Sequence, residues 1–288
     1  MNKLSIVLAV RNEEENIRKC LESVKDIADE IVVVDEYSAD NTAKIAKEFN
    51  ANVYEESHRA IFHETKQIAL SKSTGDWILQ LDADEVVTPE LAKEIKEVID
   101  LNYTQVIKRK HISPEKWNLF QRHQKLVEER DGKIGKQTGE VVAFFVPRLN
   151  YFLGVPMKHS GIYPDGVIRL VRKGKARFPA KSVHEQIRVD GEVSWLENDL
   201  MHNDSPTFKK YLTRLNRYTD LHSNELLISK APRNIFYMFY YSVIKAKLTF
   251  INIFIKHAGF KDGDRGFIWS FFSAMHFPIA YFKYWTKK

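Results

Sequence analysis

The 288-residue chain is long enough for one large domain, or for a domain with an appendage. Its hydrophobic content of 44% and charged content of 28% exclude a disordered protein. A single cysteine, Cys20, excludes an intrachain disulfide and favours a reducing compartment. The apolar residues 4–10 are too few for a signal peptide. The sequence contains no run of 18 uncharged apolar residues, so it predicts no membrane span.

The net charge of +6 is distributed unevenly. Residues 1–100 carry 12 Lys/Arg against 22 Asp/Glu, a net charge of −10, and residues 208–288 carry 14 against 4, a net charge of +10. An acidic front and a basic, aromatic tail should have different partners. The acidic front argues against a nucleic-acid binder.

In the first hundred residues, apolar strands alternate with segments of helical periodicity. We expect helices to begin near Asn12 (with Glu15 as a capping-box partner), Asp40, Ile61 and Thr88. Strands separated by helices indicate a parallel sheet that is covered on both faces and binds ligands at the carboxyl ends of its strands. The expected strands are Leu4–Val10, Ile31–Val34, Asn52–Tyr54 and Trp77–Leu81.

After residue 100 the pattern is less regular. We expect a strand at Gln105–Lys110, a long loop or partial helix over Ser113–Gly139, and a helix beginning at Thr207. Glycine and proline residues separate several shorter apolar runs. The shorter strands are expected at Val141–Pro147, Val167–Val171 and Ile187–Val189.

The stretch WILQLDADE places three carboxylates, Asp82, Asp84 and Glu85, directly after a strand. Like charges repel, so the cluster needs a cation. Two aspartates that flank Ala83 on a turn could hold one hard divalent ion, Mg²⁺ or Mn²⁺, together with substrate phosphates. A capped, solvated turn would explain the same residues without a ligand.

The stretch IVVVDEYSADNT places Asp35 at the end of a strand and Asp40 after a short loop. Carboxylates at strand ends commonly accept hydrogen bonds from a ribose or a base. Asp40 could also serve only as a helix N-cap.

The stretches LSIVLAVRNEEENI, IVVVDEYSADNT and GDWILQLDADE resemble, in order and spacing, the nucleotide-sugar-binding half of family 2 glycosyltransferases. The stretches GIYPDGVIRLVRKGKARF, SVHEQIRVDG and LMHNDSPTFKKYLTRLNRY resemble the branch that includes lipopolysaccharide core glucosyltransferases. The resemblance covers almost the whole chain. It implies a GT-A, Rossmann-like α/β fold, with a mostly parallel sheet covered by helices on both faces. From the composition of the tail we expect, in addition, a C-terminal helical, membrane-associating extension. The implied parts are a nucleotide-sugar half (1–100), an acceptor-binding and catalytic half (101–206), and an amphipathic, aromatic helical region (207–288).

The resemblance also implies roles for individual residues. Asp82 and Asp84 would hold the metal and the diphosphate, and His202 would add a third metal ligand. Where the family usually has small residues after the acid that matches Asp35, this chain has Glu36-Tyr37, so the base pocket should differ in shape. The predicted nucleotide-sugar site comprises Val10, Arg11, Asn12, Glu13, Asp35, Asp40, Lys66, Asp82, Ala83 and Arg169, with Gln67 beside Lys66.

Inverting glycosyl transfer also needs a carboxylate that takes the proton of the acceptor hydroxyl. Glu185 follows the carboxylate cluster by about a hundred residues, where such enzymes place their base, and Asp165 is the second candidate. Either could instead be an ordinary surface residue on a turn. Arg169 and Arg172 suit contact with a phosphate or an anionic acceptor.

The basic, aromatic tail contains two apolar stretches, Ile235–Ile255 and Phe267–Phe282, separated by a turn at Gly259–Gly266. Lysines and aromatic residues in such stretches favour helices that lie in the headgroup region of an anionic membrane. A helical cap on the catalytic domain, or a dimer interface, would explain the same pattern.

The sequence therefore predicts a metal-dependent inverting glycosyltransferase. It would move a sugar from a nucleotide sugar, a UDP-sugar in the first instance, to a lipid-linked saccharide or lipopolysaccharide core at the cytoplasmic face of the cell membrane. Two alternatives remain. One keeps the donor chemistry but uses a polyprenyl phosphate, protein or peptide as acceptor, and the other is a nucleotide-sugar-binding or assembly protein without catalysis.

Overall fold

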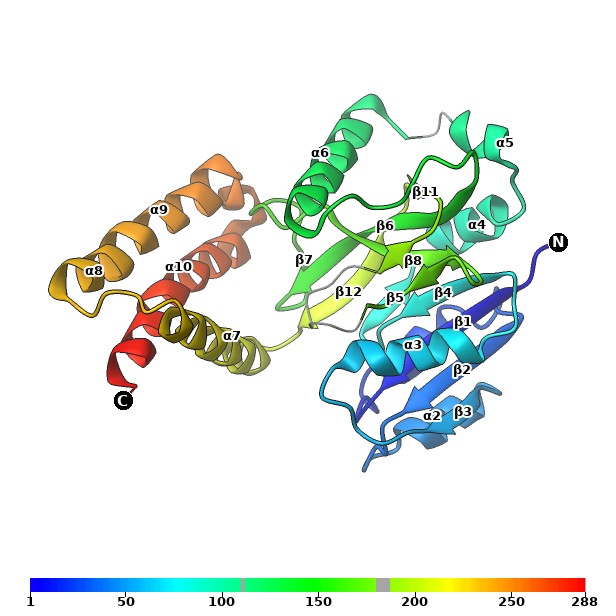
Figure 1. Cartoon of the computed structure of the whole chain (residues 1–288), viewed down its shortest axis with the longest axis horizontal. Helices are drawn as coiled ribbons and strands as arrows, with labels where there is room; N and C mark the ends of the chain where they lie inside the picture. Colours follow the sequence, from blue (N-terminus) through cyan, green and yellow to red (C-terminus); the bar gives the residue numbers. More distant parts are fainter. Residues whose placement is uncertain (110–111, 180–186, 288) are drawn as a thin grey trace. The chain divides into compact units, whose positions relative to one another are not determined.

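The chain folds into two units that differ in secondary structure (Figure 1). The sheet unit comprises residues 1–148 and 164–202, and the helical unit comprises residues 149–163 and 203–288. The computed structural model describes the chain in three stretches, residues 1–109, 112–179 and 187–287.

One mixed sheet has the order β3-β2-β1-β4-β8-β6-β12-β5, and β7 and β11 also pair with β6. The first four strands along this order are parallel, as predicted, whereas β8 is antiparallel to β4 and to β6, and β12 is antiparallel to β5. A separate pair joins β9 and β10. The strands are β1 Leu4–Val10, β2 Glu30–Asp35, β3 Asn52–Glu55, β4 Trp77–Leu81, β5 Glu85–Val87, β6 Val141–Phe152, β7 Val155–Pro156, β8 Asp165–Arg172, β9 Ala176–Arg177, β10 Arg188–Val189, β11 Glu192–Trp195 and β12 Leu200–Ser205.

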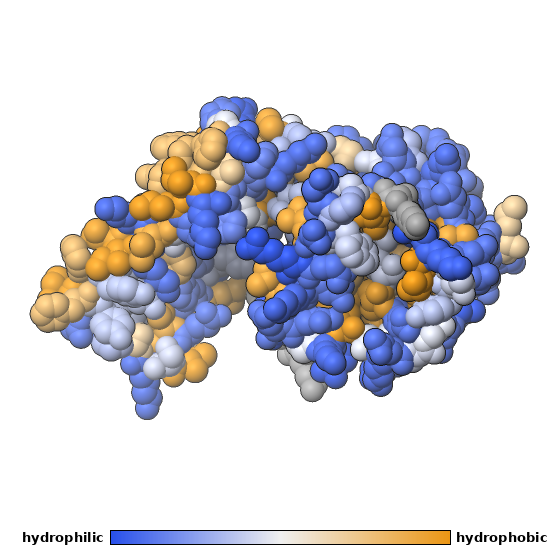
Figure 2. Space-filling model, turned by 90° about the horizontal axis from the view of Figure 1, so that it is seen from above, coloured by the Kyte–Doolittle hydropathy of each residue, from blue (hydrophilic) through white to orange (hydrophobic). Residues whose placement is uncertain are grey.

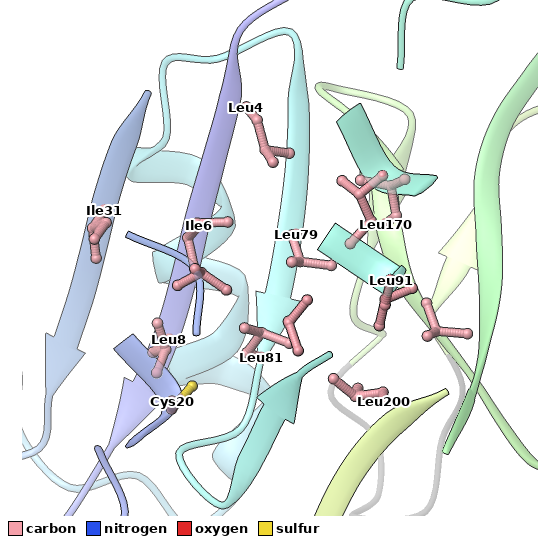
Figure 3. Close-up of a cluster of buried hydrophobic side chains, with 14 of the residues drawn as sticks. Leu4, Ile6, Leu8, Cys20, Ile31, Leu79, Leu81, Leu91, Leu170 and Leu200 are labelled. Atoms are coloured by element: carbon pink, nitrogen blue, oxygen red, sulfur yellow. The ribbon is translucent and has the colours of Figure 1, made fainter. Parts of the chain in front are cut away.

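Helices cover both faces of the sheet. Side chains alternate along each strand, so each strand contributes to both cores. In β1, Leu4, Ile6 and Leu8 point to the face covered by α1, α2 and α4, where Cys20 also packs (Figure 3). Val7 points to the opposite face, which α3 and α6 cover. The helices of this unit are α1 Ile17–Glu22, α2 Thr42–Glu48, α3 Phe62–Lys72, α4 Pro89–Val98, α5 Tyr103–Ile107 and α6 Pro114–Asp131.

Two elements after residue 100 differ from the prediction. The strand expected at Gln105–Lys110 is wrong, because Tyr103–Ile107 is the helix α5. Asn102 accepts a hydrogen bond from the Gln105 amide, and the Gln105 side chain accepts one from the Asn102 amide, which is a capping box. The expected long loop or partial helix contains the 18-residue helix α6, which is capped by Ser113.

The expected capping role of Asn12 is also wrong. Helix α1 begins at Ile17, and the Asn12 side chain accepts a hydrogen bond from the Ala39 amide in the loop after β2 instead. Asp40 behaves nearly as expected, because its carboxylate accepts a hydrogen bond from the amide of Thr42, the first residue of α2.

The helical unit is built around α10, which packs against α7 and along the helix from Ile235 to Lys256. Its buried positions include three small residues at four-residue spacing, Gly266, Ser270 and Ala274, which allow neighbouring helices to approach closely. The elements are α7 Phe208–Ile228, α8 Ile235–Phe239, η1 Tyr240–Lys245, α9 Ala246–Ile251, η2 Asn252–Lys256, η3 Gly259–Asp262 and α10 Gly263–Thr286, of which η1 and η2 are π-helical and η3 is a 3₁₀ turn.

The helix Ile235–Lys256 is long and apolar enough to cross a membrane, and none of its most apolar stretch is buried in the protein. The sequence did not predict this, because Lys245 and Lys247 interrupt the apolar run. Core helices of soluble proteins can have the same length and composition.

Candidate functional site

The carboxyl ends of β1, β2 and β4 meet at one edge of the sheet, and they bring most of the predicted donor-site residues together. Val10 at the end of β1 is opposite Asp35 at the end of β2, and Leu8 is opposite Leu81, which directly precedes Asp82. Asp35 and Asp82 therefore follow strands that flank β1, about 10 Å apart at two strand spacings.

The loops after β1 and β2 are joined by hydrogen bonds. The Asn12 amide donates to Ser38 Oγ over 2.9 Å, and the Ala39 amide donates to Asn12 Oδ1 over 2.8 Å. Ser38 in turn donates its amide and its hydroxyl to the Asp35 carboxylate. Each carboxylate oxygen can accept a second hydrogen bond, so Asp35 is held in place and can still accept from a ribose or a base.

The second carboxylate at this edge, Asp82, is surrounded by cations. Its Oδ1 lies 2.5 Å from Lys66 Nζ, and its Oδ2 lies 2.5 Å from Arg169 Nη2. The Asp82 amide donates to Glu85 Oε2 over 3.0 Å, which fixes the turn. The Asp82 side chain remains 27% exposed, so a ligand can reach it.

Two arginines, the buried Arg169 and the half-buried Arg148, neutralise Glu85, which is fully buried. Arg169 Nη2 donates to Glu85 Oε1 over 2.6 Å, and Arg148 Nη1 donates to the same oxygen over 3.3 Å. Arg148 also donates two hydrogen bonds to Asp165, over 3.0 and 2.6 Å. Asp165, the second candidate for the base, is therefore held beside the cluster by an arginine that the sequence analysis missed.

These charges shift the pKa values of both aspartates. Burial would raise the pKa of Asp82, but the guanidinium of Arg169 and the ammonium of Lys66 hold it well below its usual range. Burial would also raise the pKa of Asp84, but the hydrogen bond and the charge of His202 lower it. Both carboxylates are therefore ionised at neutral pH.

Asp84 and His202, two of the three predicted metal ligands, lie together. His202 Nε2 is 3.5 Å from Asp84 Oδ2, and β12 places His202 opposite Glu85 of β5. An oxygen and a nitrogen at this separation suit one divalent ion. Asp82 fits that role less well, because both its oxygens are held by cations. Among the residues that the structure describes, no three His, Cys, Asp or Glu side chains form a metal site by themselves.

Glu36 and Tyr37, which depart from the family pattern, have opposite environments. Glu36 is buried and accepts hydrogen bonds from Thr65 Oγ1 and, over 2.6 Å, from the ring of His58. Tyr37 is 64% exposed and has φ 48°, a left-handed conformation that is strained for a bulky residue. The large side chain is thus presented to solvent directly after Asp35 and Glu36.

The remaining predicted residues have varied positions. Ala83 is buried in the turn, and Gln67 accepts a hydrogen bond from the Phe178 amide rather than facing the cluster. Arg172 forms an exposed ion pair with Glu140. Glu185, the first candidate for the base, lies outside the described residues.

A family model, Glycosyl transferase family 2, matches residues 5–159, which is more than half of the chain. The chain belongs to glycosyl transferase family 2. Together with the sheet described above, this confirms the predicted GT-A fold; the membrane-associating role of the C-terminal helices stays a prediction.

Among curated relatives, the lipopolysaccharide core biosynthesis glycosyltransferase LpsC of Rhizobium meliloti is 26% identical over 273 residues, which cover 92% of this chain and 85% of that protein. An uncharacterised glycosyltransferase of Rickettsia typhi is 39% identical over 98 residues, 34% of this chain and 33% of that protein. A TPR repeat-containing protein of Synechococcus elongatus is 39% identical over 100 residues, 35% of this chain and 25% of its own length. The chain thus matches a third of the length of the Rickettsia typhi protein and a quarter of the length of the Synechococcus elongatus protein.

Among solved structures, glucosyl-3-phosphoglycerate synthase of Mycobacterium tuberculosis is 26% identical over 30% of this chain and 34% of its own, with a TM-score of 0.27.

Proposed function

We propose that this family 2 protein is an inverting glycosyltransferase that moves a sugar from a nucleotide sugar, a UDP-sugar in the first instance, to a lipid-linked saccharide or lipopolysaccharide core. The observation that carries the proposal is the meeting of Asp35, Asp82 and Asp84 at one sheet edge, beside Lys66 and Arg169. The carboxylates suit a ribose and a divalent ion, and the two cations suit the negative charge of a diphosphate. The relative LpsC supports the class of acceptor.

A divalent ion, Mg²⁺ or Mn²⁺, would be held by Asp84 and His202, with Asp82 adjoining. When bound, it would offset the negative charge on the departing diphosphate. Lys66 and Arg169 keep Asp82 ionised and fixed in position. Glu185 remains our first candidate for the base, so Glu185→Gln should preserve donor binding and abolish turnover. Normal turnover by that variant would contradict the assignment.

The test of this proposal is nucleotide release from a panel of nucleotide sugars, measured with and without Mg²⁺ or Mn²⁺. One nucleotide sugar should be hydrolysed slowly even without an acceptor, and a chelator should stop the reaction. Release of no nucleotide by the intact protein, combined with tight nucleotide-sugar binding, would favour the non-catalytic binding protein. Adding polyprenyl phosphates, glycolipids and peptides to the active combination would separate the classes of acceptor.

We further propose that the helical unit lies on the anionic cytoplasmic face of the cell membrane. Figure 2 shows apolar side chains gathered over the helices α8 to α10, at the left of the view. Phe236 and Leu248 are 80% and 59% exposed. Lys245 lies over the rings of Tyr241 and Phe277 at 4.6 and 4.4 Å, so its charge is accommodated by aromatic faces as in an interfacial helix.

Vesicle flotation tests the membrane proposal. The intact protein should float with phosphatidylglycerol vesicles more than with phosphatidylcholine vesicles, and Leu248→Asp should reduce flotation. Leu126→Asp is the matched control, because Leu126 is equally exposed, at 58%, on the helix α6 of the sheet unit. Equal flotation of the two variants would support the dimer-interface or cap explanation instead.

A further inference from the structure

The helical unit contains a cavity of about 420 Å³ that the donor chemistry does not use. Helices α7, α9 and α10 and the end of β12 form its walls. Its volume lies in the range of small-molecule sites, about 300–1,000 Å³. The apolar part of the wall is largely aromatic and consists of Tyr211, Leu215, Tyr218, Trp269 and Phe277.

The two charged groups of the wall, Arg214 and Asp204, are already paired with each other. Arg214 donates hydrogen bonds to the carboxylate of Asp204 and, over 3.0 Å, to its main-chain carbonyl, and Ser205 Oγ donates to the same carboxylate over 2.9 Å. A strongly polar ligand would have to break these pairs and would gain little by doing so. The wall is therefore better suited to an apolar ligand.

One end of the wall carries a pair of neutral histidines. His276, which lines the cavity, is hydrogen-bonded to His222 over 3.0 Å between ring nitrogens, and the two rings are stacked with centroids 5.1 Å apart. Burial, with the nearby charges of His222, Lys245 and Lys283, lowers the pKa of His276 to about 4. This end of the cavity is therefore uncharged at neutral pH.

The helix α9 connects the cavity with the exposed apolar surface. Thr249 lines the cavity, whereas its neighbours Leu248 and Ile251 are exposed. The same helix is part of the one whose length and composition suffice for a membrane. One face of α9 is therefore exposed and apolar, and the other face lines the cavity. A hydrocarbon chain that leaves a bilayer at the exposed face would have only this helix to pass before it reaches the cavity.

We propose that this cavity binds one hydrocarbon chain of the lipid that carries the acceptor. The inference rests on the lipid-linked acceptor of the proposed function and assigns its chain to the helical unit. Aromatic rings and Leu215 would take the chain out of water, which is the main source of affinity for such a ligand. Acyl and isoprenoid chains share this chemistry.

The test uses cis-parinaric acid, a fluorescent straight-chain fatty acid, titrated into the intact protein without vesicles. The wild type should bind it saturably. Thr249→Phe should weaken binding by about tenfold or more, because the half-buried position directs the new ring into the cavity. Leu248→Phe, the matched control, adds the same ring at the adjacent exposed position and should bind as the wild type does. Absence of saturable binding, or equal binding by both variants, would overturn the proposal.

A second readout does not depend on how Thr249→Phe folds. Dibromostearic acid should quench the fluorescence of Trp269 in the cavity wall, so the quenched part of the signal should be lost in Trp269→Phe. Equal quenching in Trp269→Phe would overturn the assignment of the site. Displacement of parinaric acid by dodecyl phosphate or by farnesyl phosphate would support the proposal. Comparing these two competitors shows whether the cavity prefers an acyl or an isoprenoid chain. Displacement by a soluble oligosaccharide alone would overturn the proposal.

Donor chemistry distinguishes this inference from the proposed function. Nucleotide-sugar hydrolysis without acceptor should be the same in the wild type and in Thr249→Phe. If the wild type binds parinaric acid but hydrolyses no nucleotide sugar, the cavity site is supported. In that case only the glycosyltransferase proposal is contradicted.

Discussion

Arg169 Nη2 lies 2.5 Å from Asp82 Oδ2, and this ion pair joins the strand β8 to the end of its antiparallel neighbour β4. The same nitrogen reaches Glu85 at 2.6 Å. Asp82, Glu85 and Asp165 are thereby matched by three cations, Lys66, Arg148 and Arg169. The acids at the end of WILQL are thus balanced in part by the protein's own side chains, and Asp84 is the one that faces His202 rather than an arginine or lysine.

Replacing Arg169 should destabilise the protein strongly. Arg169→Met leaves Asp82 and Glu85 without their shared partner, and breaking such a buried pair costs about 3–5 kcal/mol. Arg172→Met is the matched control, because Arg172 lies on the same strand in an exposed pair with Glu140 and should cost about 0–1 kcal/mol. Urea denaturation measures both, and similar losses would show that the buried network contributes no more than a surface pair.

Asp84→Ala should abolish metal-dependent turnover, with a loss of about 100-fold or more, because it removes an oxygen ligand beside His202. Glu97→Ala, an exposed acid on α4, should leave turnover unchanged. Initial rates of nucleotide release over a range of Mn²⁺ concentrations provide the measurement. Full activity of Asp84→Ala at the wild type's metal concentration would rule out Asp84 as a ligand.

The left-handed conformation of Tyr37 predicts a difference between two small replacements. Tyr37→Gly should be more stable than Tyr37→Ala by about 1 kcal/mol, because glycine adopts positive φ without the Cβ clash. Thermal unfolding compares the two variants, and an alanine variant at least as stable as the glycine variant would contradict the strain. Since both lack the ring, any contact of Tyr37 with the base should raise the KM for the donor equally in both.

His276 predicts that the helical unit loses stability in mild acid. Its folded pKa of about 4 lies below the unfolded value of about 6.5, so the unfolded state binds the proton more readily. Its contribution to stability is complete above about pH 6.5 and is lost as the pH falls towards 4. Unfolding temperatures measured from about pH 7.5 to 4 should fall less steeply for His276→Gln. If the unfolding temperatures of the wild type and of His276→Gln fall in parallel with pH, the lowered pKa of His276 is contradicted.

The sequence predicted the parallel half of the sheet well, because apolar runs and helical periodicity are local signals. The prediction from the sequence failed where contacts between distant residues decide the local structure. The Asn12 side chain binds the Ala39 amide, 27 positions away, instead of capping the nearest helix. A local signal was also missed at the strand expected over Gln105–Lys110, because Asn102 and Gln105 form the capping box that begins the helix α5.

The site shows the same division. Strand ends placed Asp35, Asp82 and Asp84 at one edge, and the register of the strands agrees with that placement. The pairing of Asp82 with Arg169 could not be predicted, because the antiparallel neighbour of β4 is set by tertiary structure. Arg148 left a usable signal, since a lone charge within the apolar run of β6 implies a buried partner.

Calorimetric titration with UDP in the presence of Mn²⁺ tests the central claim, that this sheet edge is a nucleotide-sugar site, most directly. The wild type should bind one equivalent, and Asp35→Ala should weaken binding by about tenfold or more, because it removes the acceptor held by Ser38 at the end of β2. Equal affinity of the two proteins for UDP, or no binding of any nucleoside diphosphate by the wild type, would contradict the account.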